Sequence, residues 1–414
     1  MADPIRLYTD PAAMEPLFPD DPSGELEALA VELIARSAAL AEAMHPVTRA
    51  AVADLVRPMN SYYSNLIEGH DTHPLDIDRA LRNDYATDKR KRDLQKEALA
   101  HIAVSKALRD GELRRTSGAD PSSEAFIKGV HRAFYEHLPE DFLRVVSKEG
   151  VEKTVIPGEY RTGEVEVGRH IAPAHAQVPR FMAHFASYYD REAAPNRSRV
   201  RRVIAMAAAH HRLVWIHPFL DGNGRVVRLC SDAWAMSDGL DAAGLWSISR
   251  GLARKRDEYR TMLEGADAPR MGDLDGRGNL SNAQLVAFCR WFLVTAIDQV
   301  SFMRDSFQLD GVLRRIDVFV DRMASEGRMR GEARHLLKDA FLRGRVSRQD
   351  AERITDTTDK TLKKITDELI ALGLLKRVEA GGGVLYEIAV PIMFSPWILP
   401  GLFPTGRESE IMAG

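Results

Sequence analysis

The segment that most constrains the fold is an apolar run at residues 200–216 that ends just before a proline. Its sequence, VRRVIAMAAAHHRLVWI, is apolar nearly all round at helical spacing, which predicts a buried central helix. Pro218 disfavours the helical conformation at His217, so the helix should end there. A glycine turn follows at residues 222–224, and residues 225–236 return to a helical pattern. The sequence therefore predicts a short loop held between two helices, one of them central.

Most of the remaining chain also has helical periodicity. Val165, Val167 and Ile171 alternate with polar residues around Gly168, which predicts a hairpin within residues 151–178. The fold class we expect is mainly α. The other predicted helical segments are 24–44, a helix pair at 46–68 with Gly69 as its C-cap, 76–110, 123–136 and 179–190.

The composition excludes several classes of protein. Fifty-seven Lys and Arg against 60 Asp and Glu give a net charge of −3, which argues against a protein that coats nucleic acid or membrane by bulk charge. Cys230 and Cys289 are too few for a disulfide framework or a four-cysteine zinc site. The N-terminus has no signal-peptide pattern, and no uninterrupted apolar run approaches a membrane span. We therefore expect a cytoplasmic protein without membrane contact.

The loop at residues 217–228, HPFLDGNGRVVR, has the side chains of a nucleotide site. A glycine turn that opens a helix presents free backbone N–H groups to an anion. Arg225 and Arg228 lie three residues apart, on one side of that helix, where they can clamp phosphate oxygens. Asp221 can supply the single carboxylate that a phosphate-bound Mg²⁺ takes from protein. His217 can act as a general base near neutral pH.

Each of these residues, taken alone, has a structural explanation, and their combination in one loop is what favours a nucleotide site. Other candidates are weaker. His210 and His211 fit a helix core better than a site, and Cys230 should be buried. Three residues are left as candidates for contact with the nucleobase or target: His170 and His175 near the predicted hairpin, and Tyr259 as a lining residue of an adenine pocket.

The loop resembles the Fic family motif HxFx(D/E)GNGRxxR. The resemblance extends to PGEYR at 157–161, to the segment 164–173 as a flap, and to the helical segment 248–263, and it covers roughly residues 45–300. It implies a helical Fic fold with a small β-hairpin flap. The residues that match the motif are His217, Phe219, Asp221, Gly222, Asn223, Gly224, Arg225 and Arg228.

Similarity to Fic enzymes implies a protein adenylyltransferase. His217 would deprotonate a hydroxyl group of a target protein, or of the chain itself, which then attacks the α-phosphate of ATP. Asp221 would hold Mg²⁺ between the α- and β-phosphates. A flap would align the target segment by strand-like backbone hydrogen bonds.

The same resemblance assigns the phosphate contacts. The amides of Gly222, Asn223 and Gly224 would form the anion hole, with the Asn223 side chain fixing the loop, and Arg225 and Arg228 would bind the β- and γ-phosphates. Doc-type toxins, which are kinases, carry a lysine-containing variant of this segment. The intact GNGR sequence favours transfer of a nucleotidyl group over transfer of a phosphoryl group.

An upstream segment resembles the inhibitory helix of Fic proteins. Residues 64–69, SNLIEG, match the pattern (S/T)xxxE(G/N) at Ser64, Glu68 and Gly69, within a helix expected at about 60–69. Ser64 and Glu68 are four residues apart and share a helix face. The resemblance implies that Glu68 pairs with Arg228 and displaces the γ-phosphate. The same glutamate would also allow removal of AMP from a modified target, so a de-adenylylase, or transfer of another nucleotide, is an alternative.

Residues 331–391 resemble a winged helix-turn-helix. Helices are predicted at 333–342, 347–354 and 359–372, followed by a hairpin. Residues 311–390 hold 16 Lys and Arg against 13 Asp and Glu, which is not a strong basic footprint. DNA binding and protein contact therefore both stay open for this part.

These patterns divide the chain into three parts. Residues 1–110 form a helical region with the inhibitory helix, 111–305 the Fic catalytic core, and 306–414 the winged helix-turn-helix domain and tail. ATP is the expected substrate and Mg²⁺ the expected metal. A nucleotide-sensing, DNA-binding transcription regulator is the alternative from another class. The target and the assembly state, including a homodimer, stay open.

Overall fold

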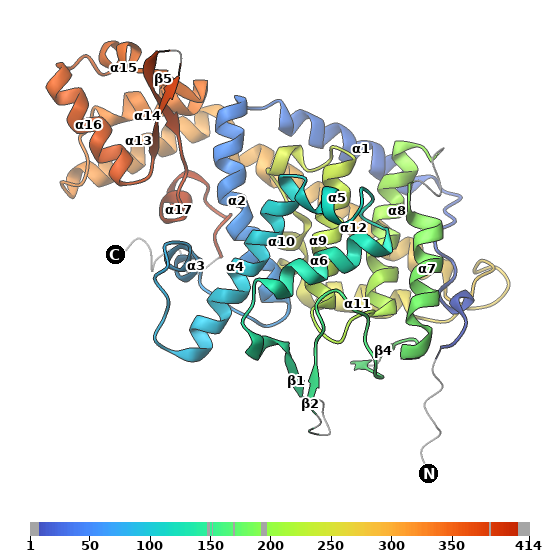
Figure 1. Cartoon of the computed structure of the whole chain (residues 1–414). Helices are drawn as coiled ribbons and strands as arrows, with labels where there is room; N and C mark the ends of the chain where they lie inside the picture. Colours follow the sequence, from blue (N-terminus) through green and yellow to red (C-terminus); the bar gives the residue numbers. More distant parts are fainter. Residues whose placement is uncertain are drawn as a thin grey trace.

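In the computed structural model the chain is mainly helical (Figure 1). The structure describes residues 8–146, 150, 152–168, 170–191, 197–380 and 382–404. Its helices up to residue 306 are α1 (Glu25–Ala41), α2 (Pro46–Ile67), α3 (Pro74–Leu81), α4 (Lys89–Arg109), α5 (Glu112–Ser117), α6 (Glu124–Glu136), α7 (Val178–Tyr189), α8 (Arg199–Ile216), α9 (Asn223–Ser237), α10 (Ile248–Arg254), α11 (Arg256–Ala266) and α12 (Asn282–Ser306).

Helix α8 is the buried central helix that the sequence predicts. It packs against α1, α7, α9 and α12, and its residues are buried from Val203 to Leu213. The Ser198 side chain caps its first turn by accepting a hydrogen bond from the amide of Arg201. The helix ends at His217, next to Pro218, as the proline predicts. The loop that follows is therefore anchored at its start by a helix that is buried over most of its length.

Two predicted helical segments differ from the structure. Residues 46–68 form one helix, α2, instead of a helix pair, because Pro58 lies inside it without ending it. Most of α2 is buried, so packing against α4 and α10 offsets the hydrogen bond that this proline cannot donate. Residues 76–110 form two helices, α3 and α4, and Asp88 caps the second of these by accepting from the amide of Lys91.

The region between α6 and α7 contains two short antiparallel hairpins. One pairs β3 (Glu166–Val167) with β4 (His170–Ile171), within the predicted hairpin segment. The other pairs β1 (Arg144–Val146) with β2 (Glu152–Thr154) and projects from the helical body (Figure 1). The sequence analysis missed this second hairpin, because strands of three residues are too short to show a clear alternation.

The C-terminal part follows the predicted order of helices and hairpin. Strands β5, β7 and β6 form a three-stranded antiparallel sheet in that order. Ser347 caps α15 by accepting from the amide of Asp350, as its sequence position suggests. The elements are α13 (Leu309–Ser325), α14 (Ala333–Arg343), β5 (Arg345–Ser347), α15 (Arg348–Thr355), α16 (Asp359–Ala371), β6 (Leu375–Ala380), β7 (Gly383–Ile388) and α17 (Ser395–Ile398).

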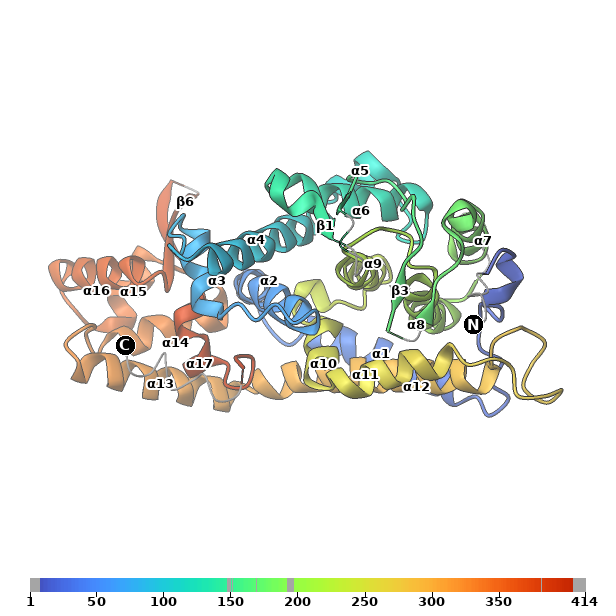
Figure 2. The same cartoon turned by 90° about the horizontal axis from the view of Figure 1, so that it is seen from below.

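The C-terminal part lies at one end of the molecule, beside α2 and α3 (Figure 2). Near the start of α2, Oγ1 of the buried Thr48 donates to the carbonyl of Phe341 at 2.6 Å. Near its end, Oη of Tyr63 donates to the carbonyl of Leu402 at 2.9 Å. Helix α2 is thus contacted near both of its ends by segments from the C-terminal part of the sequence.

Helix α12 is long and apolar enough, by length and composition, to cross a membrane. The sequence analysis expects no such span. In the structure α12 packs against α1, α8, α10 and α11, and more than half of its most apolar window is buried inside the molecule. Its apolar character is therefore used in the helical core.

Candidate active site

The loop between α8 and α9 lies at a cavity of about 1210 Å³, a volume that includes the solvent-open space at its mouth. The end of α2, one face of α4 and strand β1 form the other walls. The cavity therefore collects residues from four distant parts of the sequence. It is lined by Glu68, His70, Lys89, Asp93, Glu97, Asp141, Phe142, Arg144, Val145, Val146, His217, Asp221, Gly222, Asn223, Gly224 and Arg225.

The hairpin next to this cavity is β1–β2. Phe142, Arg144, Val145 and Val146 line the cavity, whereas none of the described residues of 164–173 does. That the segment 164–173 forms the flap stays a prediction, and Arg161 ties Pro173 at the end of this segment to the His217 carbonyl. Glu164 holds His175, whose ring Nδ1 lies 2.6 Å from the Glu164 carboxylate. Neither residue lines the cavity.

The glycine turn is held by a side chain from inside the loop. Asn223 Oδ1 accepts from the amide of Phe219 at 2.9 Å, and its Nδ2 donates to the Phe219 carbonyl at 2.8 Å. Phe219 is fully buried and stacks on His131 with 3.9 Å between ring centroids. Gly222 has a φ of +76°, a left-handed conformation that favours glycine, and it begins α9. The first amides of α9 are therefore presented at the loop.

His217 adopts a backbone conformation that is uncommon for any residue except glycine, with φ +50° and ψ +60°. Arg161 supports it from behind, because Nε of Arg161 donates to the His217 carbonyl at 2.9 Å and its amide donates to the Pro218 carbonyl at 2.9 Å. Burial, helped by the nearby charges of His170 and Arg161, lowers the pKa of His217 to about 4. The imidazole is therefore neutral at physiological pH and can accept a proton.

Arg161 is a residue whose structural role the sequence reasoning missed, although it stands in the PGEYR segment. Its side chain is buried and also donates to the carbonyls of Gly163, at 3.0 Å, and Pro173. One guanidinium thus joins the connection after α6 to the backbone of the His217 loop.

Asp221 lies on the cavity side of the loop. Its Oδ2 accepts from Oη of Tyr135 at 2.6 Å and from Nη2 of Arg225 at 3.3 Å. Burial alone would raise the pKa of Asp221, but Arg225 and Tyr135 more than offset this, and the net pKa is lowered. The carboxylate is therefore ionised and still partly open to solvent.

The hydrogen bonds of Arg228 to the C-terminal end of α2 hold its guanidinium in place. Its Nε donates to Ser64 Oγ at 2.9 Å, while Nη2 donates to the Ser64 carbonyl at 2.9 Å and to Oε1 of Glu68 at 2.6 Å. Arg228 is 1% exposed, so its guanidinium is buried where these contacts form. The predicted pairing of Glu68 with Arg228 is present in the structure.

Glu68 is the C-cap residue of α2, and the next residue, Gly69, has a φ of +90° that favours glycine. Burial would raise the pKa of Glu68, but Arg228, which donates to it, and Arg225 lower it overall. Glu68 therefore stays ionised. It also lies against the glycine turn, since a Cβ atom on Gly224 would come within 2.2 Å of Glu68 Oε1.

Comparison with known proteins explains this geometry. Residues 121–235 match the Fic/DOC family. Over 82 residues the chain is 39% identical to the protein adenylyltransferase Fic of Drosophila sechellia and of Drosophila melanogaster. This stretch is 20% of the chain, and the chain spans 16% of the length of these curated relatives.

Solved structures show the same fold. A Fic family protein from Desulfovibrio desulfuricans G20 matches with a TM-score of 0.50 at 18% identity, over 91% of this chain and 98% of that one. Fic-1 from C. elegans matches with a TM-score of 0.51 at 16% identity, over 69% of this chain and 74% of that one. The predicted mainly helical Fic fold is confirmed.

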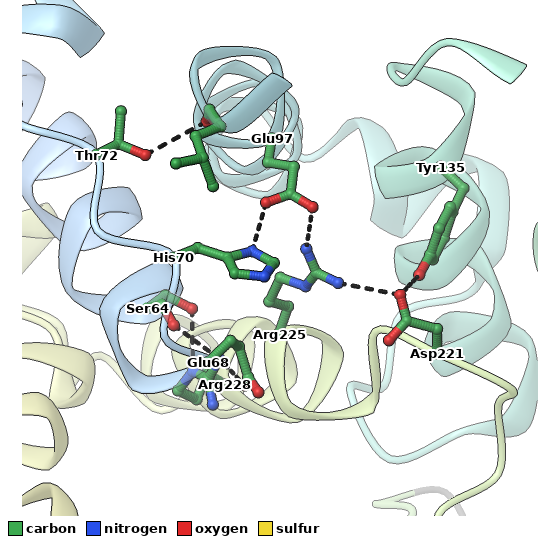
Figure 3. Close-up of polar contacts among 10 residues, drawn as sticks. Ser64, Glu68, His70, Thr72, Glu97, Tyr135, Asp221, Arg225 and Arg228 are labelled. Atoms are coloured by element: carbon green, nitrogen blue, oxygen red, sulfur yellow. Dashed lines mark hydrogen bonds and ion pairs between the residues drawn. The ribbon is translucent and has the colours of Figure 1, made fainter. Parts of the chain in front are cut away.

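The Fic domain supplies only one side of the site. Ser64 and Glu68 come from α2, and Glu97 comes from α4, all before residue 121. Glu97 Oε1 accepts from Nη1 of Arg225 at 3.1 Å, and its Oε2 lies 2.5 Å from Nδ1 of His70 (Figure 3). The sequence analysis missed Glu97 and His70, since no motif marks them and α4 begins with a run of exposed charges.

The remaining candidates of the Fic domain and its surroundings lie outside the cavity lining. His210 Nδ1 bonds to Ser231 and its Nε2 bonds to Oη of Tyr259, both at 2.8 Å, inside the core. Tyr259 is buried and does not line the cavity. His170 contacts the carbonyl of Trp215 and the carboxylate of Asp267, away from the cavity lining. His211 and Cys230 are buried, as expected.

Proposed function

We propose that this chain is a protein adenylyltransferase, which transfers AMP from ATP to a hydroxyl group of a target protein or of itself, and that Glu68 inhibits it. The observation that carries the proposal is the contact of Glu68 with Arg228 and Gly224 at one end of a cavity lined by His217 and Asp221. The match of the chain to adenylyltransferases over a short stretch supports the chemistry.

The neutral imidazole of His217 takes the proton of the attacking hydroxyl group. The oxygen of that group forms a bond to the α-phosphorus of ATP, and the bond from this phosphorus to the oxygen bridging to the β-phosphate breaks. Pyrophosphate leaves with the electron pair of the broken bond. Catalysis of this kind depends on positioning and charge stabilisation, which the backbone around His217 supports through Arg161.

The phosphates are bound by the start of α9. The backbone N–H groups that follow Gly222 lie at the N-terminus of α9, which is the positive end of the helix dipole. They therefore suit an anion. Arg225 binds the β-phosphate from the cavity wall. Arg228 binds the γ-phosphate, but only after Glu68 and Ser64 have released it.

Asp221 fits the expected Mg²⁺ by its chemistry. It is an ionised carboxylate that faces the cavity, and Tyr135 and Arg225 hold it in place. Among the described residues, no group of three or more His, Cys, Asp or Glu side chains could hold a metal ion without other ligands. Mg²⁺ typically takes one or two protein carboxylates and completes its shell with phosphate and water, so the single carboxylate of Asp221 could serve as its protein ligand. When bound, the ion would be held by Asp221 and would neutralise negative charge on the phosphates.

The test compares ATP labelled in the α-phosphate with ATP labelled in the γ-phosphate. Glu68→Gly is expected to become labelled, or to label proteins of a lysate, from the α-position only and much more strongly than the unchanged chain. Glu68→Gly/His217→Ala is the matched control and should give no label. Label from the γ-position would indicate phosphoryl transfer, and equal labelling with and without Glu68 would refute inhibition.

We further propose that residues 333–388 act as a winged helix-turn-helix that packs on its own chain. The order α14, β5, α15, α16, β6, β7 supports the winged helix-turn-helix. In α16 the charges of Lys360, Lys363 and Lys364 are offset by Asp359, Asp367 and Glu368, which favours protein contact over DNA. Random-sequence duplex at low salt should therefore not be retarded in a gel, and retardation would favour DNA binding.

A further inference from the structure

The two arginines of the loop face two different carboxylates. Arg228 meets Glu68 and Arg225 meets Glu97, both as direct ion pairs. The proposed function assigns inhibition to Glu68 and assigns nothing to Glu97. The surroundings of the two carboxylates differ enough to give them opposite roles.

Glu68 is placed where an incoming group can displace it from Arg228. It stands at the end of α2, its side chain is 34% exposed, and it lies in the cavity against Gly224. A phosphate group that enters the same space competes with it for Arg228.

Glu97 is fixed in position by its surroundings. It lies inside α4, and its side chain is 10% exposed. Both of its carboxylate oxygens are engaged, one by Arg225 at 3.1 Å and the other by His70 at 2.5 Å (Figure 3). The segment that carries His70 is itself tied to α4, because Thr72 Oγ1 donates to the Leu94 carbonyl at 3.5 Å.

Arg225 is thereby held on three sides. Nη1 is bound by Glu97, Nη2 donates to Asp221, and the guanidinium carbon lies 4.8 Å from the centre of the Phe134 ring. Because Glu97 takes the Nη1 side, the Nη2 side is directed to Asp221 and hence to the place where the phosphates are proposed to bind. Without Glu97, a buried cation would have Asp221 as its one ion-pair partner and would be drawn toward it.

We propose that Glu97 is a positioning residue for nucleotide binding: it orients Arg225 toward the phosphates, and His70 orients Glu97. This inference rests on the proposed function, since it takes Arg225 to be a phosphate ligand. The two carboxylates should therefore have opposite effects. Loss of Glu68 should free Arg228 for nucleotide, whereas loss of Glu97 should weaken nucleotide binding.

The experiment measures ATP binding apart from catalysis. In the Glu68→Gly/His217→Ala chain, which cannot turn over, calorimetry with ATP and Mg²⁺ gives the dissociation constant. Adding Glu97→Ala should raise the dissociation constant for ATP roughly tenfold or more. Glu97→Gln keeps an acceptor for Arg225, so it should raise the dissociation constant less. Adding Glu97→Ala to a chain that already carries Arg225→Ala should change it less than twofold.

The matched control is Asp238→Asn, which also removes a buried carboxylate that pairs with arginines, Arg191 and Arg202, but lies outside the cavity. It should lower the melting temperature without changing ATP binding. If Glu97→Ala does not fold, Glu97→Gln and His70→Gln are tested in its place. Each should raise the dissociation constant for ATP about threefold or more.

Kinetics in the Glu68→Gly chain give a second measurement. Glu97→Ala should raise KM for ATP more than it lowers kcat. An unchanged dissociation constant in a folded Glu97→Ala chain would overturn the inference, and tighter binding would make Glu97 a second inhibitory residue instead. If Glu68→Gly transfers no AMP at all, the proposed function fails, while the binding measurement still tests Glu97.

Discussion

Gly224 and Glu68 share a space with no room for one more carbon atom, because a Cβ on Gly224 would lie 2.2 Å from Oε1 of Glu68. The glycine of the loop thus fits closely against Glu68, the residue proposed to inhibit the site. Since the opposing atom is the end of a flexible side chain, Glu68 would have to give way.

Gly224→Ala should therefore destabilise the unchanged chain and not the Glu68→Gly chain. With Glu68 present, the new methyl group displaces the carboxylate from Arg228, at an expected cost of about 1–3 kcal/mol. With Glu68 absent, the methyl group meets only Nη1 of Arg228 at 3.0 Å among these neighbours, and the helix preference of alanine in α9 should offset most of that contact. Urea unfolding of the four chains measures this coupling. Gly311→Ala in α13 is the control and should give additive effects with Glu68→Gly.

Ser64→Ala should release part of the inhibition. The hydroxyl group accepts from Arg228 Nε at 2.9 Å, while the Ser64 carbonyl and Glu68 remain as partners. Loss of one hydrogen bond to a charged group should raise labelling from α-labelled ATP about tenfold, less than Glu68→Gly does. Ser61→Ala removes a buried hydroxyl from the same helix that contacts Ala98 instead, and should lower stability without raising labelling. Equal labelling by both variants would contradict this prediction.

Arg161→Lys should slow transfer in the Glu68→Gly chain. A lysine keeps the charge but cannot reach the carbonyls of His217, Gly163 and Pro173 together, as the guanidinium does. Because His217 shifts and the phosphate ligands do not, kcat should fall about tenfold or more with KM for ATP little changed. Arg202→Lys, which changes a forked arginine bound to Asp238, should leave both constants unaltered. A rise in KM alone would contradict the role of Arg161.

The protein should lose stability as the pH falls below about 6.5. Burial lowers the pKa of His101 and His210 to about 3 and of His131 to about 4, so these rings stay neutral in the folded chain while the unfolded chain takes up protons. His101→Leu should reduce the fall in unfolding free energy between pH 7 and pH 5 by about 2 kcal/mol. Urea unfolding at the two pH values checks this. The exposed His137, changed to leucine, should leave the difference unaltered.

The sequence predicted those features that are encoded within one continuous segment of the chain. The periodicity of residues 200–216 located α8, and the loop with the GNGR sequence located the start of α9. Ser64 and Glu68 could be linked to Arg228 because both lie in recognisable motifs.

Other features depend on contacts that no local pattern records. Glu97 and Arg225 are 128 residues apart, and Glu97 stands in a helix that begins with exposed charges. Pro58 is tolerated in α2 only because the surrounding packing holds the helix. The β1–β2 hairpin has strands of three residues each, so its place beside the cavity follows from tertiary structure.

The contacts of α2 with the C-terminal part of the chain form late during synthesis. Thr48 and Tyr63 emerge from the ribosome early, but their acceptors on Phe341 and Leu402 follow hundreds of residues later. The loop at 217–228 is made in between. The growing chain therefore carries the proposed chemistry before the helix that restrains it has its full set of contacts, and a product broken off before Phe341 would keep the loop without those contacts.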